Sequence, residues 1–217
     1  MAGESREQLR NRATAIVKKL RKQYPDARTE LVFSTPLEML VATILSAQAT
    51  DVGVNKVTPA LFAKYKTAAD WADAPQEVLE QEIRSTGFYR NKAKSIRLAA
   101  AMLVEKFGGR VPDDMDRLLE LPGVARKTAN VVLGSAFGKA QGIAVDRHVA
   151  RVSGRMKLTK NVDPVKIEQD LMVLVPRKDW INFSHAMVLH GRRICTARKP
   201  KCEICPVKGL CPSAFKV

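Results

Sequence analysis

Apolar residues recur every three to four positions along most of the chain, which is the period of an amphipathic helix. In the first such segment one face carries Leu9, Ala13, Ile16, Val17 and Leu20, and Arg and Lys side chains occupy the opposite face. Similar stripes follow at residues 37–45, 54–65, 76–85, 93–107, 115–121, 127–137, 147–156, 164–175 and 180–194. Pro and Gly residues separate these segments, and no hairpin turn lies between alternating β-branched runs. The pattern predicts an all-α protein of about ten short helices.

The 217-residue chain carries 37 Lys and Arg against 22 Asp and Glu, a formal charge of +15. A hydrophobic content of 46% excludes a disordered basic tail, and no apolar run reaches the roughly 18 residues of a membrane span. The charge therefore indicates a polyanionic partner, which is DNA, RNA or an anionic membrane surface. Residues 121–217 hold 18 basic and 6 acidic side chains, so this part of the chain carries most of the signal. No secretion or targeting signal is seen, which predicts a cytoplasmic location.

All four cysteines lie in the last 23 residues, spaced C-x6-C-x2-C-x5-C. They are Cys195, Cys202, Cys205 and Cys211. Disulfides are disfavoured without a secretion signal. Structural zinc sites more often use two CxxC-like pairs or add histidine, whereas four thiolates on one short loop suit an iron–sulfur cluster. The spacing favours the cluster and leaves zinc or free thiols as alternatives.

The segment 121–130, Leu-Pro-Gly-Val-Ala-Arg-Lys-Thr-Ala-Asn, predicts a tight turn that leads into a helix. The first N–H groups of such a helix have no partner within it, and together with the helix dipole they suit a phosphate. Contacts of this kind position a protein on DNA without reading its sequence. The turn and helix start are therefore a candidate phosphate site, formed by Gly123, Ala125 and Arg126.

Lys127 stands near the start of that helix, where a cation is slightly unfavourable. The positive end of the dipole and neighbouring Arg126 both disfavour the ammonium form, so we expect a lowered pKa and more free amine. Lys127 is then a candidate nucleophile. The alternative role, a surface lysine that contacts a phosphate, explains a lysine at this position equally well.

Asp146 follows the apolar run 143–145 and precedes the helical segment 147–156. One interpretation is a helix N-cap, and the other is a carboxylate held beside a pocket; the two are compatible. Arg147, Arg151 and Arg155 recur every four residues, and like charges at that spacing repel by a few tenths of a kcal/mol. A row of like charges is easier to explain if it faces phosphates than if it has no anionic partner.

Taken together, these motifs resemble the endonuclease III family of DNA glycosylases, which are helix-hairpin-helix enzymes with an iron–sulfur cluster. The resemblance runs from about Pro36 to Cys211. It is carried by Leu-Ser-Ala-Gln-Ala-Thr-Asp at 45–51, the hairpin at 121–130, Val-Asp-Arg-His at 145–148, and the segment 191–211.

The resemblance implies a bifunctional DNA glycosylase and abasic-site lyase that removes oxidised pyrimidines from duplex DNA. It implies two helical domains, residues 29–139 and residues 1–28 with 140–217, with the active site in the cleft between them. By the same resemblance Lys127 attacks C1′ and forms a Schiff base, Asp146 assists it, and the four cysteines bind a [4Fe–4S] cluster. A monomer acting at a bacterial or archaeal nucleoid is the expected form.

The resemblance also implies DNA contacts, because a base that is flipped out leaves a gap in the stack. Gln48 fills this gap and Phe88 takes the place of the family's wedge side chain; a capping amide and a core aromatic are the alternative interpretations. The remaining expected DNA contacts are Gly123, Ala125, Arg126, Arg147, His148 and Arg151.

Four departures from the family pattern bear on substrate range and rate. The loop 138–142, before Asp146, looks one residue longer than usual. Phe88 replaces a more typical leucine, and Arg147 a more typical threonine. Ala125 stands where the family hairpin usually has glycine, so we expect a strain of about 1 kcal/mol there if the turn needs a positive φ. Two other functions are weighed against the lyase, namely a monofunctional mismatch glycosylase of the same superfamily and a non-catalytic, metal-stabilised DNA-binding module.

Overall fold

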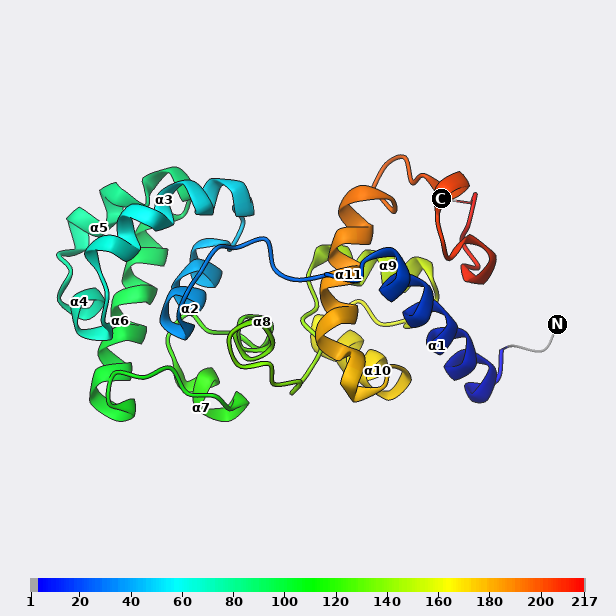
Figure 1. Cartoon of the computed structure of the whole chain (residues 1–217), viewed down its shortest axis with the longest axis horizontal. Helices are drawn as coiled ribbons and strands as arrows, with labels where there is room; N and C mark the ends of the chain where they lie inside the picture. Colours follow the sequence, from blue (N-terminus) through cyan, green and yellow to red (C-terminus); the bar gives the residue numbers. More distant parts are fainter. Residues whose placement is uncertain (1–3, 217) are drawn as a thin grey trace. The chain divides into compact units, whose positions relative to one another are not determined.

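The computed structural model describes residues 4–216, and every regular element in that range is a helix (Figure 1). Eleven α-helices and four 3-10 helices lie within it, so the all-α prediction is confirmed. The chain forms two compact units. The middle unit is Thr29–Gln141, and the terminal unit combines the residues up to Arg28 with those from Gly142 onward.

The middle unit is built around one apolar core. Its elements are α2 (Pro36–Leu45), α3 (Asp51–Lys64), α4 (Ala68–Asp73), α5 (Gln76–Glu82), η1 (Arg84–Thr86), α6 (Tyr89–Phe107), α7 (Met115–Glu120) and α8 (Arg126–Phe137). Helix α2 is buried from Met39 to Leu45 and packs against α8. Helix α6 packs against α4 and α5. Helices α7 and α8, the two ends of the hairpin segment, bury residues in this same core.

The terminal unit is organised around α11 (Figure 1). Its elements are α1 (Arg6–Gln23), α9 (Arg147–Arg155), α10 (Pro164–Leu174), η2 (Arg177–Asp179), α11 (Trp180–Arg193), η3 (Cys202–Ile204) and η4 (Lys208–Leu210). Helices α1 and α9 both pack against α11, whose Phe183 and Met187 are almost fully buried. After α11 the chain continues as an irregular cysteine loop with two short 3-10 turns.

One helix was missed by the sequence prediction, and another begins well before its expected start. Helix α4 was not predicted, although Thr67 and Asp70 form a capping box at its start and Trp71 anchors it in the core. Helix α6 begins at Tyr89, four residues before the expected start, because Phe88 ends the preceding turn in a left-handed conformation with φ of 49°.

None of the helices in the described part of the chain has the length and apolar character that crossing a membrane requires.

Candidate functional site

The turn between α7 and α8 is a tight one, closed by the N–H of Val124 on the carbonyl oxygen of Leu121 at 3.0 Å. Gly123 has φ of 79°, a conformation that strains any residue with a Cβ atom. A Cβ at this position would also lie 2.7 Å from the Cβ of Ser95 on α6. Glycine is therefore required twice, once by the turn and once by the close approach of α6.

Ala125 is extended, with φ of −90° and ψ of 168°, and is the N-cap of α8. The expected strain at Ala125 is therefore wrong, because the positive φ of the turn belongs to Gly123 and any residue adopts the conformation of Ala125. Alanine has no side-chain acceptor, and this helix start has no side-chain cap. No side-chain acceptor of the cap residue competes for the first N–H groups of α8, and an anion site there stays a prediction.

Lys127 is the second residue of α8 and is exposed. The next residue, Thr128, lines a cavity of about 250 Å³ in the middle unit. The other residues that line this cavity are Thr43, Ile44, Ala47, Gln48, Phe88, Asn91, Lys92, Ser95 and Gly123. The structure therefore gathers three of the predicted DNA contacts, Gln48, Phe88 and Gly123, around one cavity beside the start of α8.

Gln48 and Phe88 share an uncommon backbone geometry. Gln48 has φ of 55° and Phe88 has φ of 49°, both in the left-handed region that non-glycine residues rarely adopt. Both side chains are exposed, and Phe88 is 61% accessible. Phe88 is therefore no core aromatic, and no side-chain hydrogen bond makes Gln48 a helix cap, since Thr50 caps α3. Backbone strain that persists at two exposed residues is typical of a functional site.

In the terminal unit, Asp146 is the N-cap of α9. Its Oδ1 accepts hydrogen bonds from the N–H groups of His148 and Val149, both at 2.8 Å. The N-cap interpretation is thus what the structure shows. It leaves Oδ2 available for a second role, since the cap uses one carboxylate oxygen.

The arginine stripe of α9 makes contacts that the sequence did not indicate. Arg151 donates to the carbonyl oxygens of Gly191 at 2.8 Å and Cys195 at 3.0 Å. Arg155 donates to the carbonyl oxygens of Thr196 and Ala197 and to the Sγ of Cys195. These two guanidinium groups hold the end of α11 and the start of the cysteine loop. Only Arg147 of the three is exposed, and a DNA contact by Arg151 stays a prediction.

His148 lies against the same helix end. Its Nδ1 is 3.2 Å from Nη2 of Arg151, and a Cβ added to Gly191 would lie 2.8 Å from the Cβ of His148. Burial lowers the pKa of His148, while the Asp146 carboxylate opposes that shift. A neutral imidazole is therefore favoured beside Arg151.

The four cysteines form no disulfide and line one pocket of the terminal unit. In the range 4–216 no three His, Cys, Asp or Glu side chains converge closely enough to hold a single metal ion. The pocket nevertheless fits an iron–sulfur cluster, because such clusters are held by four thiolates spread around them. Burial raises the pKa of Cys205 and of Cys211, so ligation to iron would have to hold these sulfurs as thiolates.

The sequence interpretation assigned no role to His190. It is fully buried, its Nδ1 is 3.3 Å from the hydroxyl of Tyr24, and its Nε2 is 3.5 Å from the Sγ of Cys205. Burial lowers its pKa to about 4. Its place on the buried face of α11, one helical turn before the loop, was the available signal.

Comparison with known proteins gives two family matches. Residues 41–177 match the HhH-GPD superfamily of base excision DNA repair proteins. Residues 195–211 match the iron-sulfur binding domain of endonuclease III, and this range begins and ends at the first and last of the four cysteines.

Individual relatives agree with these matches. The chain is 55% identical to endonuclease III of Synechocystis sp. over 205 residues, covering 94% of each protein. It is 48% identical to endonuclease III of Bacillus subtilis, covering 91% of this chain and 90% of the relative. Among solved structures, a trapped endonuclease III–DNA covalent intermediate with an estranged adenine is similar with a TM-score of 0.90 and 46% identity. The similarity covers 94% of this chain and 96% of that one.

Proposed function

The chain belongs to the endonuclease III family, within the HhH-GPD superfamily of base excision DNA repair proteins, and from this membership we propose how its residues divide the work. It is a DNA glycosylase and abasic-site lyase of base excision repair, with DNA as its partner. This enzymatic function excludes the alternative of a non-catalytic DNA-binding module. Removal of oxidised pyrimidines from duplex DNA is the substrate range that we assign to it.

Lys127 is the proposed nucleophile. Its amine attacks C1′ of the damaged nucleoside, the bond from C1′ to the base breaks, and the base leaves with a proton. The sugar ring opens to a Schiff base between Nζ and C1′. Loss of a proton from C2′ then expels the 3′ phosphate by breaking the C3′–O bond. The observation that carries this assignment is an exposed lysine at the second residue of α8, directly after the hairpin turn.

Asp146 is the proposed anion for the same reaction. Positive charge grows on the sugar as the base leaves, and a carboxylate stabilises it. One oxygen of Asp146 is held by two backbone N–H groups at 2.8 Å, which fixes the carboxylate and leaves Oδ2 for the proposed role. Lys127 and Asp146 belong to different units, so each role needs its own variant.

The cofactor is a [4Fe–4S] cluster, whose ligands we assign to Cys195, Cys202, Cys205 and Cys211. When bound, the cluster supplies structure by fixing the shape of a loop that has little apolar core of its own. Arg151 and Arg155 stabilise the start of that loop by donating hydrogen bonds to its first carbonyl oxygens. We further propose that the protein acts as a monomer in the cytoplasm, at the nucleoid.

Borohydride trapping tests the central assignment, because reduction of a Schiff base leaves a stable covalent link. We expect the wild-type protein to be trapped on duplex DNA with an abasic site or an oxidised pyrimidine. Lys127→Ala should lose trapping while DNA binding survives; efficient trapping by this variant would overturn the assignment. Asp146→Asn keeps an N-cap acceptor but removes the charge, so we expect normal folding and DNA binding with slow turnover. Wild-type turnover by Asp146→Asn would leave Asp146 as a cap alone.

A further inference from the structure

Lys92, in the first turn of α6, is a buried lysine whose ammonium contacts backbone carbonyls. The residue is 5% accessible. Its Nζ donates to the carbonyl oxygen of Leu45 at 2.7 Å and to that of Thr86 at 2.7 Å. Burial lowers its pKa. Lysine is almost never fully buried without a partner, so a site that keeps this one requires an explanation.

The two carbonyls lie at the ends of helices. Leu45 is the last residue of α2, and Thr86 is the last residue of η1. Carbonyl groups in the last turn of a helix have no partner within it, and the negative end of the helix dipole favours a cation. One ammonium thus satisfies a carbonyl group from each of two helix ends, which offsets part of the cost of its burial.

Each carbonyl also begins a segment with an exposed tip. Leu45 is followed by residues 46–50, the Gln48 loop, in which Gln48 has φ of 55°. Thr86 is followed by residues 87–88, the Phe88 turn, in which Phe88 has φ of 49°. Gln48, Phe88 and Lys92 line the same cavity. The ammonium of Lys92 therefore connects the starts of the two segments. Leu45 lies three residues before Gln48, and Thr86 lies two residues before Phe88.

We propose that Lys92 is a positioning residue, which fastens the Gln48 loop and the Phe88 turn at one point and so fixes the spacing of the two side chains that enter the DNA duplex. The proposal rests on the proposed function, and on the DNA contacts that the family resemblance implies, in which Gln48 fills the gap and Phe88 is the wedge. Lys92 touches neither the nucleotide nor Lys127. Its effect is on opening the duplex, and the subsequent chemistry at C1′ does not depend on it.

The test compares two substrates that differ in how much opening they require. A paired, oxidised pyrimidine has to be unstacked before it reacts, whereas an abasic site has no base to unstack. Lys92→Met keeps the aliphatic stem and removes the charge. We expect its single-turnover glycosylase rate on the paired lesion to fall roughly tenfold or more, since misplacement by about 1 Å costs up to a hundredfold. Its borohydride trapping on an abasic site should stay within about threefold of wild type.

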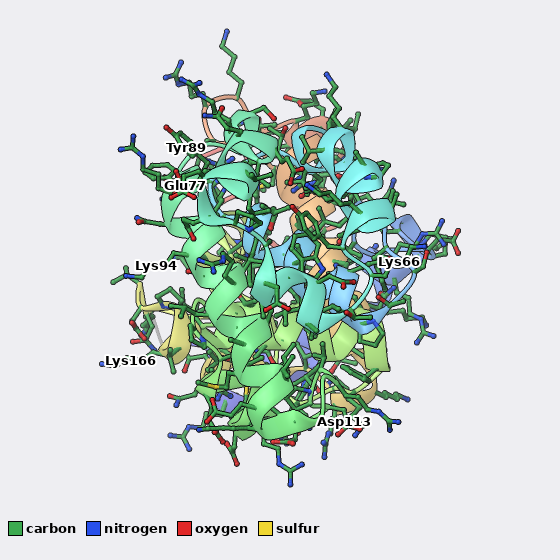
Figure 2. All side chains as sticks on the ribbon, turned by 90° about the vertical axis from the view of Figure 1, so that its left-hand side faces the viewer. Lys66, Glu77, Tyr89, Lys94, Asp113 and Lys166 are labelled. Atoms are coloured by element: carbon green, nitrogen blue, oxygen red, sulfur yellow. The ribbon has the colours of Figure 1, made fainter. Side chains whose placement is uncertain are left out.

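Lys94→Met is the matched control. Lys94 lies on the same helix, two residues further along, and its side chain points outward into solvent (Figure 2). The substitution removes the same charge but leaves the two carbonyl contacts intact. We expect both rates of Lys94→Met to stay near wild type. Equal losses of Lys92→Met on both substrates, or a lesion-to-abasic ratio equal to that of Lys94→Met, would overturn the proposal.

A second experiment leaves Lys92 in place and covers the case in which its variant does not fold. If Lys92 holds both segments in place, Gln48 and Phe88 should act together. The effects of Gln48→Ala and Phe88→Ala on the glycosylase rate should then not be additive. Additive effects in the protein that retains Lys92 would contradict the proposal. Failure of the wild-type protein to be trapped at all would instead overturn the proposed function, so the two failures are distinguishable.

Discussion

At the scale of single residues, His190 connects the packing of the terminal unit to its cofactor. A thiolate that ligates iron accepts hydrogen bonds and donates none, so Nε2 of His190 carries the proton toward Cys205. Nδ1 is then the acceptor for the hydroxyl of Tyr24, at 3.3 Å. The lowered pKa of His190, about 4, keeps the imidazole neutral. Two contacts thus orient a donor at the sulfur.

We expect His190→Phe to lower the reduction potential of the bound cluster. A donor to sulfur stabilises the reduced, more negative cluster, so its loss favours the oxidised form. Tyr24→Phe is the control, because it removes the orienting hydroxyl but leaves the Nε2 donor, and its shift should be smaller. Voltammetry of the purified holoproteins measures both potentials. An unchanged potential in His190→Phe would mean that the ring only fills space.

The residue scale is also where sequence reasoning was least complete. The types and spacing of Lys127, Asp146 and the four cysteines made them candidates, and the family resemblance implied their roles. The role of Lys92 could not, since lysines are ordinarily exposed and its partners lie 47 and 6 residues away in the sequence. Likewise, the contacts of Arg151 join residues 44 positions apart, so only the tertiary fold reveals them.

At the scale of elements, the hairpin shows which part of a local motif the sequence determines. Pro-Gly predicted the turn between α7 and α8, and the structure confirms it. The distribution of φ values within the turn was not predicted, and the positive φ expected at Ala125 belongs to Gly123, which adopts it without strain. The capping box of α4 was a readable signal that the apolar period alone did not detect, because α4 is only six residues long.

Two glycine substitutions separate conformational strain from packing at the hairpin. Gly123→Ala meets both a positive φ and Ser95, so we expect a loss of unfolding free energy of about 2–4 kcal/mol. Gly138→Ala also has a positive φ, of 64°, but nothing lies within 4 Å of the added Cβ. Its expected loss is about 1 kcal/mol. Denaturant unfolding measures both, and equal losses would show that α6 yields at Ser95 without cost.

At the scale of the whole molecule, the two units differ sharply in charge. The terminal unit holds 23 basic and 9 acidic residues, a balance of +14, whereas the middle unit holds 14 and 13. The sequence alone placed the excess beyond residue 120. The fold corrects that boundary, because α1 joins the terminal unit while the hairpin belongs to the middle unit. We therefore expect the middle unit to contact DNA mainly through backbone N–H groups and the exposed side chains of Gln48 and Phe88.

This asymmetry predicts which surface charges set the salt dependence of DNA binding. Each phosphate contact releases counterions and adds about 0.9 to the slope of log affinity against log salt. Replacing Arg147, Arg198 and Lys199 by glutamine removes three exposed charges from the terminal unit. Replacing Lys66, Lys94 and Arg110 removes three exposed charges from the middle unit. We expect the first triple variant to lower the slope by about 2–3 and the second to change it by less than about 1. Both variants have the same net charge, so equal slopes would mean that the overall charge of +15, and not its placement, governs binding.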